Sequence, residues 1–130
     1  MNEQVVVIAA VLAALQVKHV LADFVFQNQY ILDHRRVWGH PGGLLHVAIH
    51  AVGTLAVLLP AGLPLALIGT MLLAEAVVHY HIDWAKDNVV DRLGVTPRDR
   101  AFWTIFGVDQ CLHQLTYVAI ALWLADAKFL

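Results

Sequence analysis

The stretch Glu75-Ala-Val-Val-His79-Tyr-His-Ile-Asp83-Trp-Ala-Lys86 decides how this chain folds. It closes an apolar run that begins at Pro64, yet it carries ionisable side chains of both signs. Residues four apart lie on the same face of a helix, so Glu75, His79 and Asp83 form one stripe. Ionisable groups in a membrane span are costly and normally face a bundle interior or a water-filled cavity. The stretch therefore predicts a membrane helix whose polar stripe faces partner helices.

Three other apolar segments carry pairs of the same kind. They are His19-x-x-x-Asp23, His46-x-x-x-His50 and Asp109-x-x-x-His113, each with one-turn spacing. A polar pair on each of four segments gives every helix a side that avoids lipid. The recurrence indicates that the four segments pack around a common polar interior.

The composition agrees with a membrane protein. Of 130 residues, 60% are hydrophobic and 14% are charged, and the mean hydropathy is +0.68. A soluble domain is about 45–50% apolar and about 25% charged. The formal charge of -2 offers no basic surface, so nucleic acid is not an expected partner.

Cysteine and serine usage exclude an internal disulfide and two kinds of functional site. Cys111 is the only cysteine, so neither an internal disulfide nor a Cys-based zinc site can form. The chain contains no serine, which excludes a serine hydrolase.

The pattern predicts an all-α polytopic membrane protein, an up-and-down bundle of four transmembrane helices within a single domain of residues 1–130. The expected spans are about 5–27, 44–59, 64–87 and 98–125, with a loop over 28–43. The first span reaches the required length of roughly 20 residues only if it includes Lys18, His19 and Asp23. Lys18 lies off the polar stripe, and we expect its long side chain to extend toward an interface.

The four polar pairs are expected at one depth of the bundle. In up-and-down order, the end of the first span, the start of the second, the end of the third and the start of the fourth lie at the same face. Each pair falls in that half of its segment. This agreement predicts one shared site.

Basic residues predict the orientation of the site. Five arginines fall in the two loops on the site's side: Arg35, Arg36, Arg92, Arg98 and Arg100. On the other side, Lys128 is the only basic residue beyond the spans. Cytoplasmic loops are enriched in basic residues. We therefore expect the site to face the cytoplasm and both termini to be external.

The residue types at the shared site indicate a metal. Histidine and aspartate suit zinc, iron or manganese, so the expected cofactor is a divalent transition metal, zinc before iron or manganese. The candidate ligands are His19, Asp23, His46, His50, His79, Asp83, Asp109 and His113. Eight donors exceed the four of a tetrahedral site, so they suit two ions, or one ion with additional carboxylates that orient the imidazoles.

Two further residues are candidates for catalysis. Glu75 lies one turn deeper than His79 and is the expected general base. Lys86 lies one turn outward from Asp83 and is expected to bind an anionic substrate group. For His34, His40 and His81, which lie in a loop or off the stripe, an ordinary structural role is expected.

Several of these motifs resemble a known family. The segments His19-Val-Leu-Ala-Asp23-Phe-Val-Phe-Gln27, His46-x-x-x-His50, His79-Tyr-His-Ile-Asp83-Trp-Ala-Lys86 and Asp109-Gln110-x-x-His113 look like the small bacterial and phage membrane proteins grouped as domain of unknown function 3307. The resemblance covers nearly the whole chain and implies four transmembrane helices in a bacterial inner membrane. The resemblance to this family implies no particular activity. The arrangement is more loosely similar to inner-membrane metal-dependent hydrolases.

Three functions are left open by the sequence. The first is a metal-dependent hydrolase that acts on a lipid or amphiphile from the cytoplasmic face. The second is a transition-metal carrier or sensor, and the third is a structural membrane protein in which polar pairs link the helices. The hydrolase is preferred because a carrier normally binds its substrate near the midplane between broken helices. Membrane lipids are the expected partners, and a homo-oligomer is left open.

Overall fold

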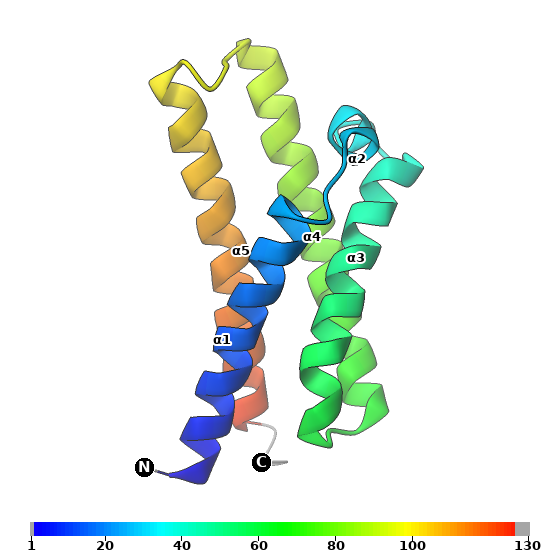
Figure 1. Ribbon diagram of the computed structural model, residues 1–130, viewed down its shortest axis with the longest axis vertical. Helices are drawn as coiled ribbons and strands as arrows, with labels where there is room; N and C mark the ends of the chain where they lie inside the picture. Colours follow the sequence, from blue (N-terminus) through cyan, green and yellow to red (C-terminus); the bar gives the residue numbers. More distant parts are fainter. Residues whose placement is uncertain (1, 127–130) are drawn as a thin grey trace.

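A computed structural model describes residues 2–126, and the described part is helical without any strand (Figure 1). The elements in chain order are α1 (Glu3–Phe24), α2 (Gln29–His34), α3 (Pro41–Leu58), the 3-10 turn η1 (Leu59–Ala61), α4 (Leu65–Leu93) and α5 (Arg100–Asp126). The all-α prediction is confirmed.

Four of these helices are long and apolar enough to cross a membrane: α1, α3 together with η1, α4 and α5. They run alternately up and down, so that α1 begins and α5 ends at the same end of the molecule (Figure 1). Packing joins α1 to α3 and α5, and α4 to α3 and α5. The four helices therefore form a closed ring around one interior.

Local chemistry fixes where the helices begin and end. The Asn2 side chain caps α1 by accepting a hydrogen bond from the backbone N–H of Gln4 at 3.1 Å. Pro41 occupies the first turn of α3, where its missing N–H removes no intrahelical bond. Gly94 ends α4 with a φ of +61°, a left-handed conformation that glycine adopts without strain.

The segment 28–43, which was expected to be a loop, contains the short helix α2. Asn28 caps α2 by accepting a hydrogen bond from the backbone N–H of Ile31 at 3.0 Å. Ile31 is fully buried, and α2 packs against α3. A six-residue helix is stable here because its one buried side chain, Ile31, is inserted into the bundle.

The distribution of side chains is the reverse of that in a soluble bundle. Large apolar side chains point outward on each spanning helix, for example Val17, Val52, Leu73 and Leu122. The buried polar and charged side chains are Lys18, His19, His46, His50, Thr54, Glu75, His79, Asp83, Asp109 and His113. Outward apolar groups are favourable next to lipid, and buried charges require partners inside the bundle.

The interior has two layers. Near the end that holds the start of α1, the helices enclose an apolar cluster of Val11, Leu15, Leu58, Leu63, Ile68, Met71, Tyr117, Ile120 and Leu124. The polar residues lie above this cluster, toward α2 and the α4–α5 turn. The apolar layer closes one end of the bundle beneath the polar layer.

Candidate metal centre

The four polar pairs meet in one buried cluster. Each spanning helix supplies two side chains: His19 and Asp23 from α1, His46 and His50 from α3, His79 and Asp83 from α4, and Asp109 and His113 from α5. Contacts within 4 Å join donor atoms across these helices. The structure thus brings together all eight side chains that the sequence analysis placed at one depth.

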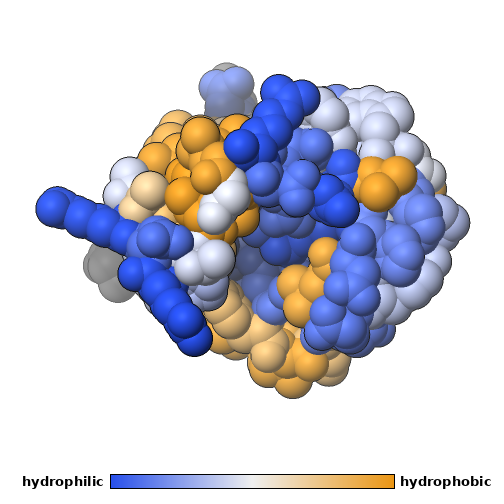
Figure 2. All heavy atoms as spheres, turned by 90° about the horizontal axis from the view of Figure 1, so that it is seen from above, coloured by the Kyte–Doolittle hydropathy of each residue, from blue (hydrophilic) through white to orange (hydrophobic). Residues whose placement is uncertain are grey.

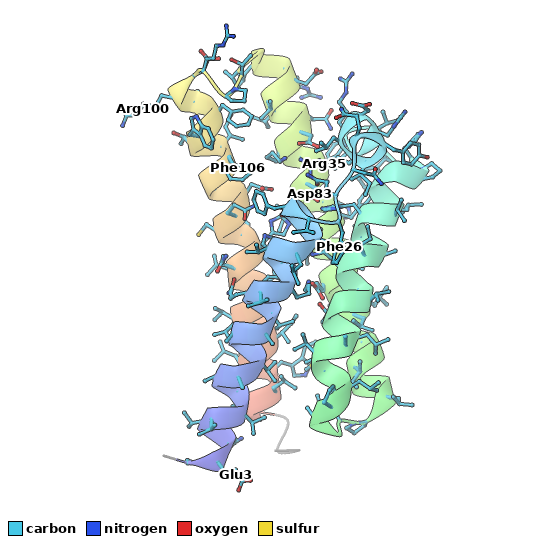
Figure 3. The ribbon with its side chains drawn as sticks, in the orientation of Figure 1. Glu3, Phe26, Arg35, Asp83, Arg100 and Phe106 are labelled. Atoms are coloured by element: carbon cyan, nitrogen blue, oxygen red, sulfur yellow. The ribbon has the colours of Figure 1, made fainter. Side chains whose placement is uncertain are left out.

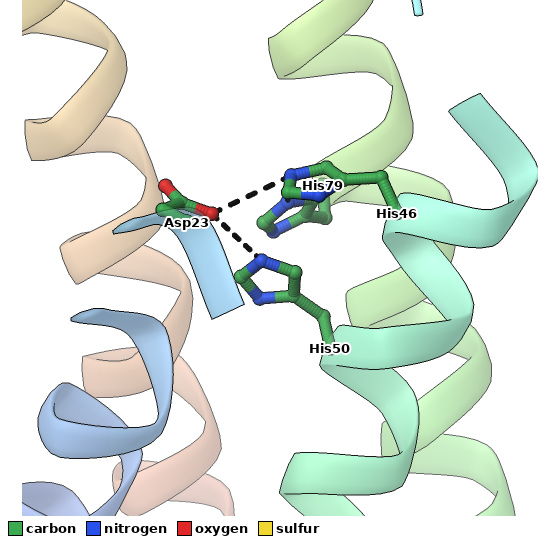
Figure 4. Close-up of side chains that lie close together, drawn as sticks. All are labelled: Asp23, His46, His50 and His79. Atoms are coloured by element: carbon green, nitrogen blue, oxygen red, sulfur yellow. Dashed lines mark hydrogen bonds and ion pairs between the residues drawn. The ribbon is translucent and has the colours of Figure 1, made fainter. Parts of the chain in front are cut away.

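The first group of possible ligands joins α1, α3 and α4 (Figure 4). One donor atom from each of Asp23, His46, His50 and His79 lies within 4.8 Å of every other. Asp23 Oδ1 lies 2.8 Å from His50 Nε2 and 3.4 Å from His46 Nε2. Four donors of this kind, three on buried histidines and one on the half-buried Asp23, can hold a metal ion.

The second group joins α4 and α5. Donor atoms of His79, Asp83 and His113 lie within 4.8 Å of one another. The Nδ1 of His113 lies 2.9 Å from the backbone carbonyl of Asp109, to which it donates its proton. The Nε2 lone pair of His113 therefore faces the centre, as a metal ligand requires.

Three donor atoms have the spacing of ligands around one ion. His46 Nε2 and His79 Nε2 are 3.3 Å apart, and Asp83 Oδ2 lies 3.0 Å from the first and 3.2 Å from the second. Tetrahedral zinc with bonds of 2.0–2.1 Å sets its ligand atoms about 3.3 Å apart. The triangle of His46, His79 and Asp83 therefore matches one face of a metal coordination shell.

Several polar atoms of the cluster lack partners. Within residues 2–126, Asp109 Oδ1 and His113 Nε2 are buried without a hydrogen bond. Asp83 Oδ2 forms none either, although the ring nitrogens of His46 and His79 lie 3.0 Å and 3.2 Å from it. A buried polar atom without a partner costs about 1–3 kcal/mol. A cation at the centre is a physical explanation for three such atoms in one place.

The two groups are connected through shared residues. His79 belongs to both. Asp83 directs Oδ2 toward His46 and His79, whereas its Oδ1 lies 3.7 Å from His113 Nε2. A carboxylate with one oxygen toward each group can bridge two ions, which lie about 3.5–4 Å apart in two-metal sites. The donor set fits either one or two ions.

Lys18 occupies a different place from the one expected. It does not extend to an interface; its side chain is only 6% exposed, and Nζ lies 2.6 Å from Glu75 Oε1. Burial of an ammonium is stabilised here by this opposite charge. Glu75, the expected general base, is therefore held in an ion pair beneath the cluster.

Lys86 and Arg35 lie on the opposite, loop side of the cluster. Lys86 Nζ contacts Asp87 Oδ1 at 2.6 Å, and Arg35 also pairs with Asp87. Burial opposes the charged form of Arg35, but the carboxylates of Asp83 and Asp87 outweigh burial and raise the pKa of its guanidinium. Figure 3 shows Arg35 just above Asp83. A permanent cation thus borders the His/Asp cluster.

The comparison with known families decides the family of this chain. Residues 11–129 match the family described as protein of unknown function (DUF3307). The chain belongs to this family. No curated protein and no solved structure matches it. The matched range includes all eight residues of the cluster together with Lys18, Glu75 and Lys86.

The cluster of this DUF3307 protein is bordered by two cavities. One, of about 470 Å³, is an apolar groove between α4 and α5, lined by residues such as Ala85, Val89 and Val108 and reaching Asp109. The other, of about 610 Å³, lies at the loop end and is lined by Arg35 and other charged residues. Lys86 lines both cavities. Viewed from that end, hydrophilic residues surround a recess (Figure 2).

Some residues at the centre of this DUF3307 protein were not predicted. The Tyr117 hydroxyl lies 3.0 Å from His19 Nδ1, and Gln110 Oε1 lies 3.1 Å from His19 Nε2. Tyr117 follows His113 by four residues, so the one-turn spacing of the polar stripe is the signal that could have identified it. Thr116, the adjacent residue, is half-buried, and its hydroxyl donates to the backbone carbonyl of Leu112.

The three histidines that were expected to have structural roles lie outside the cluster. His34 and His40 stack on each other, with ring centroids 4.2 Å apart, beside α2. His81 is exposed, and its Nδ1 donates to the backbone carbonyl of Val77 at 2.6 Å.

Proposed function

We propose that this DUF3307 protein is a membrane-embedded metal-dependent hydrolase whose substrate is an amphiphile. The observation that carries the proposal is the triangle formed by His46, His79 and Asp83. Three protein ligands that leave a coordination position open are typical of catalytic zinc sites, whereas structural sites use four. Zinc is the first candidate, and iron or manganese would suit the same donors.

A bound divalent metal supplies an activated water at neutral pH. The protein must then provide a base within reach of that water. Asp109 supports this role because its Oδ1 is buried without a hydrogen-bond partner in the described chain and the residue borders the α4–α5 groove. Glu75, the base expected from the sequence, is less suitable because Lys18 neutralises it.

The surroundings of the cluster support an amphiphilic substrate. The α4–α5 groove is apolar and open at the surface of the bundle, where a spanning protein meets lipid chains. At its polar end, Lys86 also lines the loop-end cavity that contains Arg35 and Arg36. A lipid with its chain in the groove and an anionic head group beside these cations matches both features.

The apolar layer favours an enzyme over a metal carrier. A carrier must open its site to both sides of the membrane in turn. Below the cluster, Leu15, Leu58 and Ile68 are fully or almost fully buried in a continuous apolar core. The cavity lined by Arg35, Arg36 and Lys86 lies above the cluster, so access from the loop end is the arrangement that we propose.

Orientation in the membrane is part of the same proposal. Arg35, Arg36, Arg92, Arg98 and Arg100 all lie at the end of the bundle that holds the loop-end cavity. The enrichment of basic residues in cytoplasmic loops places that end in the cytoplasm of a bacterium, with the inner membrane around the helices.

Metal content and turnover test the proposal. Protein purified in detergent without chelator should contain at least one transition-metal ion per chain by elemental analysis. His79→Ala and Asp83→Asn should lose most of it, whereas His81→Ala, a histidine change outside the cluster, should keep it. Turnover is then measured with a panel of phospholipids and other lipid esters. Metal-free wild-type protein, or zinc flux into proteoliposomes without any hydrolysis product, would overturn the hydrolase.

A further inference from the structure

A buried lysine beside the candidate metal centre has three hydrogen-bond acceptors. Lys18 Nζ lies 2.6 Å from Glu75 Oε1, 3.0 Å from the Tyr117 hydroxyl and 3.2 Å from His50 Nδ1. An ammonium group has three protons and no lone pair, so it can only donate. With the Glu75 carboxylate as its counter-ion, Lys18 uses one proton for each of the three neighbours.

The position of Lys18 depends on a glycine of another helix. A Cβ atom on Gly53 of α3 would lie 2.5 Å from Lys18 Cγ and 2.9 Å from Lys18 Cδ. Only a residue without a side chain leaves room for the lysine stem to pass into the bundle. The close approach therefore directs the ammonium of α1 toward Glu75 and His50.

The ammonium determines which nitrogen of His50 carries the proton. Because Lys18 donates to His50 Nδ1, that nitrogen must be the unprotonated one in the neutral ring. The proton then lies on Nε2, which is 2.8 Å from Asp23 Oδ1. A carboxylate oxygen accepts a hydrogen bond, so the contact at the other side of the ring requires the same tautomer.

Lys18 also fixes the tautomer of His19, through the hydroxyl of Tyr117. The Tyr117 oxygen accepts from Lys18, and its own proton is then donated to His19 Nδ1 at 3.0 Å. His19 Nε2 carries the ring proton and faces Asp23 Oδ2 at 3.2 Å and Gln110 Oε1 at 3.1 Å. Gln110 must present its oxygen, because its amide nitrogen donates to Asp109 Oδ2 at 3.1 Å.

We infer that Lys18 is a positioning residue of the metal centre. It fixes the tautomers of His50 and, through Tyr117, of His19, so that both rings donate to Asp23 and neither binds metal. Each oxygen of Asp23 accepts a hydrogen bond from one imidazole, Oδ1 from His50 and Oδ2 from His19. The side chains left to bind metal are His46, His79 and Asp83 Oδ2 around one ion, with His113 facing the second oxygen of Asp83 and Asp23 at the edge of the site.

Unpartnered polar atoms support this division of the cluster. In the described residues, the atoms of Lys18, His19 and His50 that face the network all have partners. Among the buried atoms without a hydrogen bond, Asp83 Oδ2 and His113 Nε2 lie on the other side, whereas Glu75 Oε2, on the counter-ion of Lys18, lies within the network. The ligand assignment rests on the proposed metal centre, whereas the tautomers follow from the hydrogen bonds of the protein alone.

Nitrogen NMR of the metal-free protein tests the inference independently of metal. Protonated and unprotonated imidazole nitrogens differ widely in ¹⁵N shift, and single His→Gln variants assign each ring. In ¹⁵N-histidine-labelled wild type, His19 and His50 should be protonated at Nε2, and His113 at Nδ1. The double variant Lys18→Met/Glu75→Gln removes the ammonium without leaving a buried carboxylate unpaired. In it, only the acceptors facing Nε2 remain to hold the rings, so the Nε2-protonated fraction of His50 and His19 should fall while His113 keeps its tautomer.

Matched variants separate positioning from packing. Glu75→Gln alone retains the donors of Lys18 and should leave the tautomers unchanged. Gly53→Ala, which displaces the Lys18 stem, should disturb His50 as the double variant does. Gly69→Ala should not, because a Cβ at Gly69 meets no atom within 4 Å. Protonation of His19 or His50 at Nδ1 in the wild type, or unchanged tautomers in the double variant, would overturn the inference.

Zinc titration of the same samples distinguishes this inference from the proposed function. Zinc should shift the ring nitrogens of His46, His79 and His113 directly and should leave the Nε2 protons of His19 and His50 in place. Loss of those two protons on zinc binding would refute the ligand assignment. Tautomers as expected in a wild type that binds no zinc would refute the metal centre, and with it the assignment of ligands.

Discussion

Arg35, which follows α2, and Asp87 of α4 form a two-pronged ion pair across the loop end of the bundle. The guanidinium donates through both Nε and Nη2 to the two oxygens of Asp87, and through Nη1 to Gln27 at 2.7 Å. Both partners of the ion pair are largely buried. This contact holds the segment after α1 against α4, directly above the candidate metal centre.

Loss of this pair should destabilise the protein. Arg35→Ala leaves Asp87 without its main donor, and hydrogen bonds to charged groups contribute about 1.5–3 kcal/mol. We expect a clearly lower melting temperature in detergent. Arg36→Ala is the control, because its pair with Asp91 is half exposed and such pairs contribute about 0–1 kcal/mol. Equal melting temperatures for the two variants would contradict this account.

Removal of metal should also lower the melting temperature. Without a cation, Asp83 Oδ2 and the Nε2 lone pair of His113 are buried without a hydrogen bond, at about 1–3 kcal/mol for each group. A chelator should therefore shift thermal unfolding downward by several degrees, and added zinc should restore it. His79→Ala should melt at the same temperature with and without chelator. A wild type that does not respond to chelator would show that no bound ion stabilises the bundle.

Replacement of Thr54 should stabilise the protein, unlike the two changes above. Its side chain is fully buried in α3, and its hydroxyl has no hydrogen-bond partner in the described part of the chain. Thr54→Val replaces the hydroxyl by a methyl group of similar size and should raise the unfolding free energy by about 1 kcal/mol. Thr70→Val is the comparison, since Thr70 is exposed and donates to the backbone of Ala66. A lower melting temperature for Thr54→Val would indicate a partner for the hydroxyl.

The fold and the membership of the cluster were predictable because both depend on the period of the helix. Glu75, His79 and Asp83 recur every fourth residue, and that spacing alone places them on one face. Alternation of helix direction then brings the stripes of four helices to the same depth. No knowledge of individual side-chain contacts was needed for this step.

The role of Lys18 was not predictable in the same way. Its direction depends on Gly53, which is 35 positions away in the chain and lies on another helix. Periodicity assigns a residue to a face of its own helix but contains no information about gaps in the surface of the neighbour. The same limit explains α2, which depends on the insertion of Ile31 into the bundle.

The orientation in the membrane can be measured by cysteine labelling. In a Cys111→Ala background, Leu65→Cys reports the α3–α4 turn and Arg92→Cys reports the α4–α5 turn, both at exposed positions. Because the arginines lie at the second turn, an impermeant thiol reagent applied to intact cells should label Leu65→Cys and should label Arg92→Cys only after lysis. The reverse pattern would invert the proposed orientation, and labelling of both sites in intact cells would contradict four spans.

The route of the substrate can be tested by filling the α4–α5 groove. Ala85 lines that groove, is exposed and is not one of the candidate ligands, so Ala85→Trp should block the groove while leaving the metal content unchanged. Hydrolysis of a long-chain lipid substrate should fall at least tenfold, whereas a short-chain soluble analogue that enters through the loop-end cavity should be affected less. Ala56→Trp is the matched control, because Ala56 lines an apolar groove of about 420 Å³ between α1 and α3. The contrary result would be that Ala56→Trp reduces turnover of the long-chain substrate and Ala85→Trp does not. The substrate would then enter beside α1, next to Lys18, and the role proposed for the α4–α5 groove would be wrong.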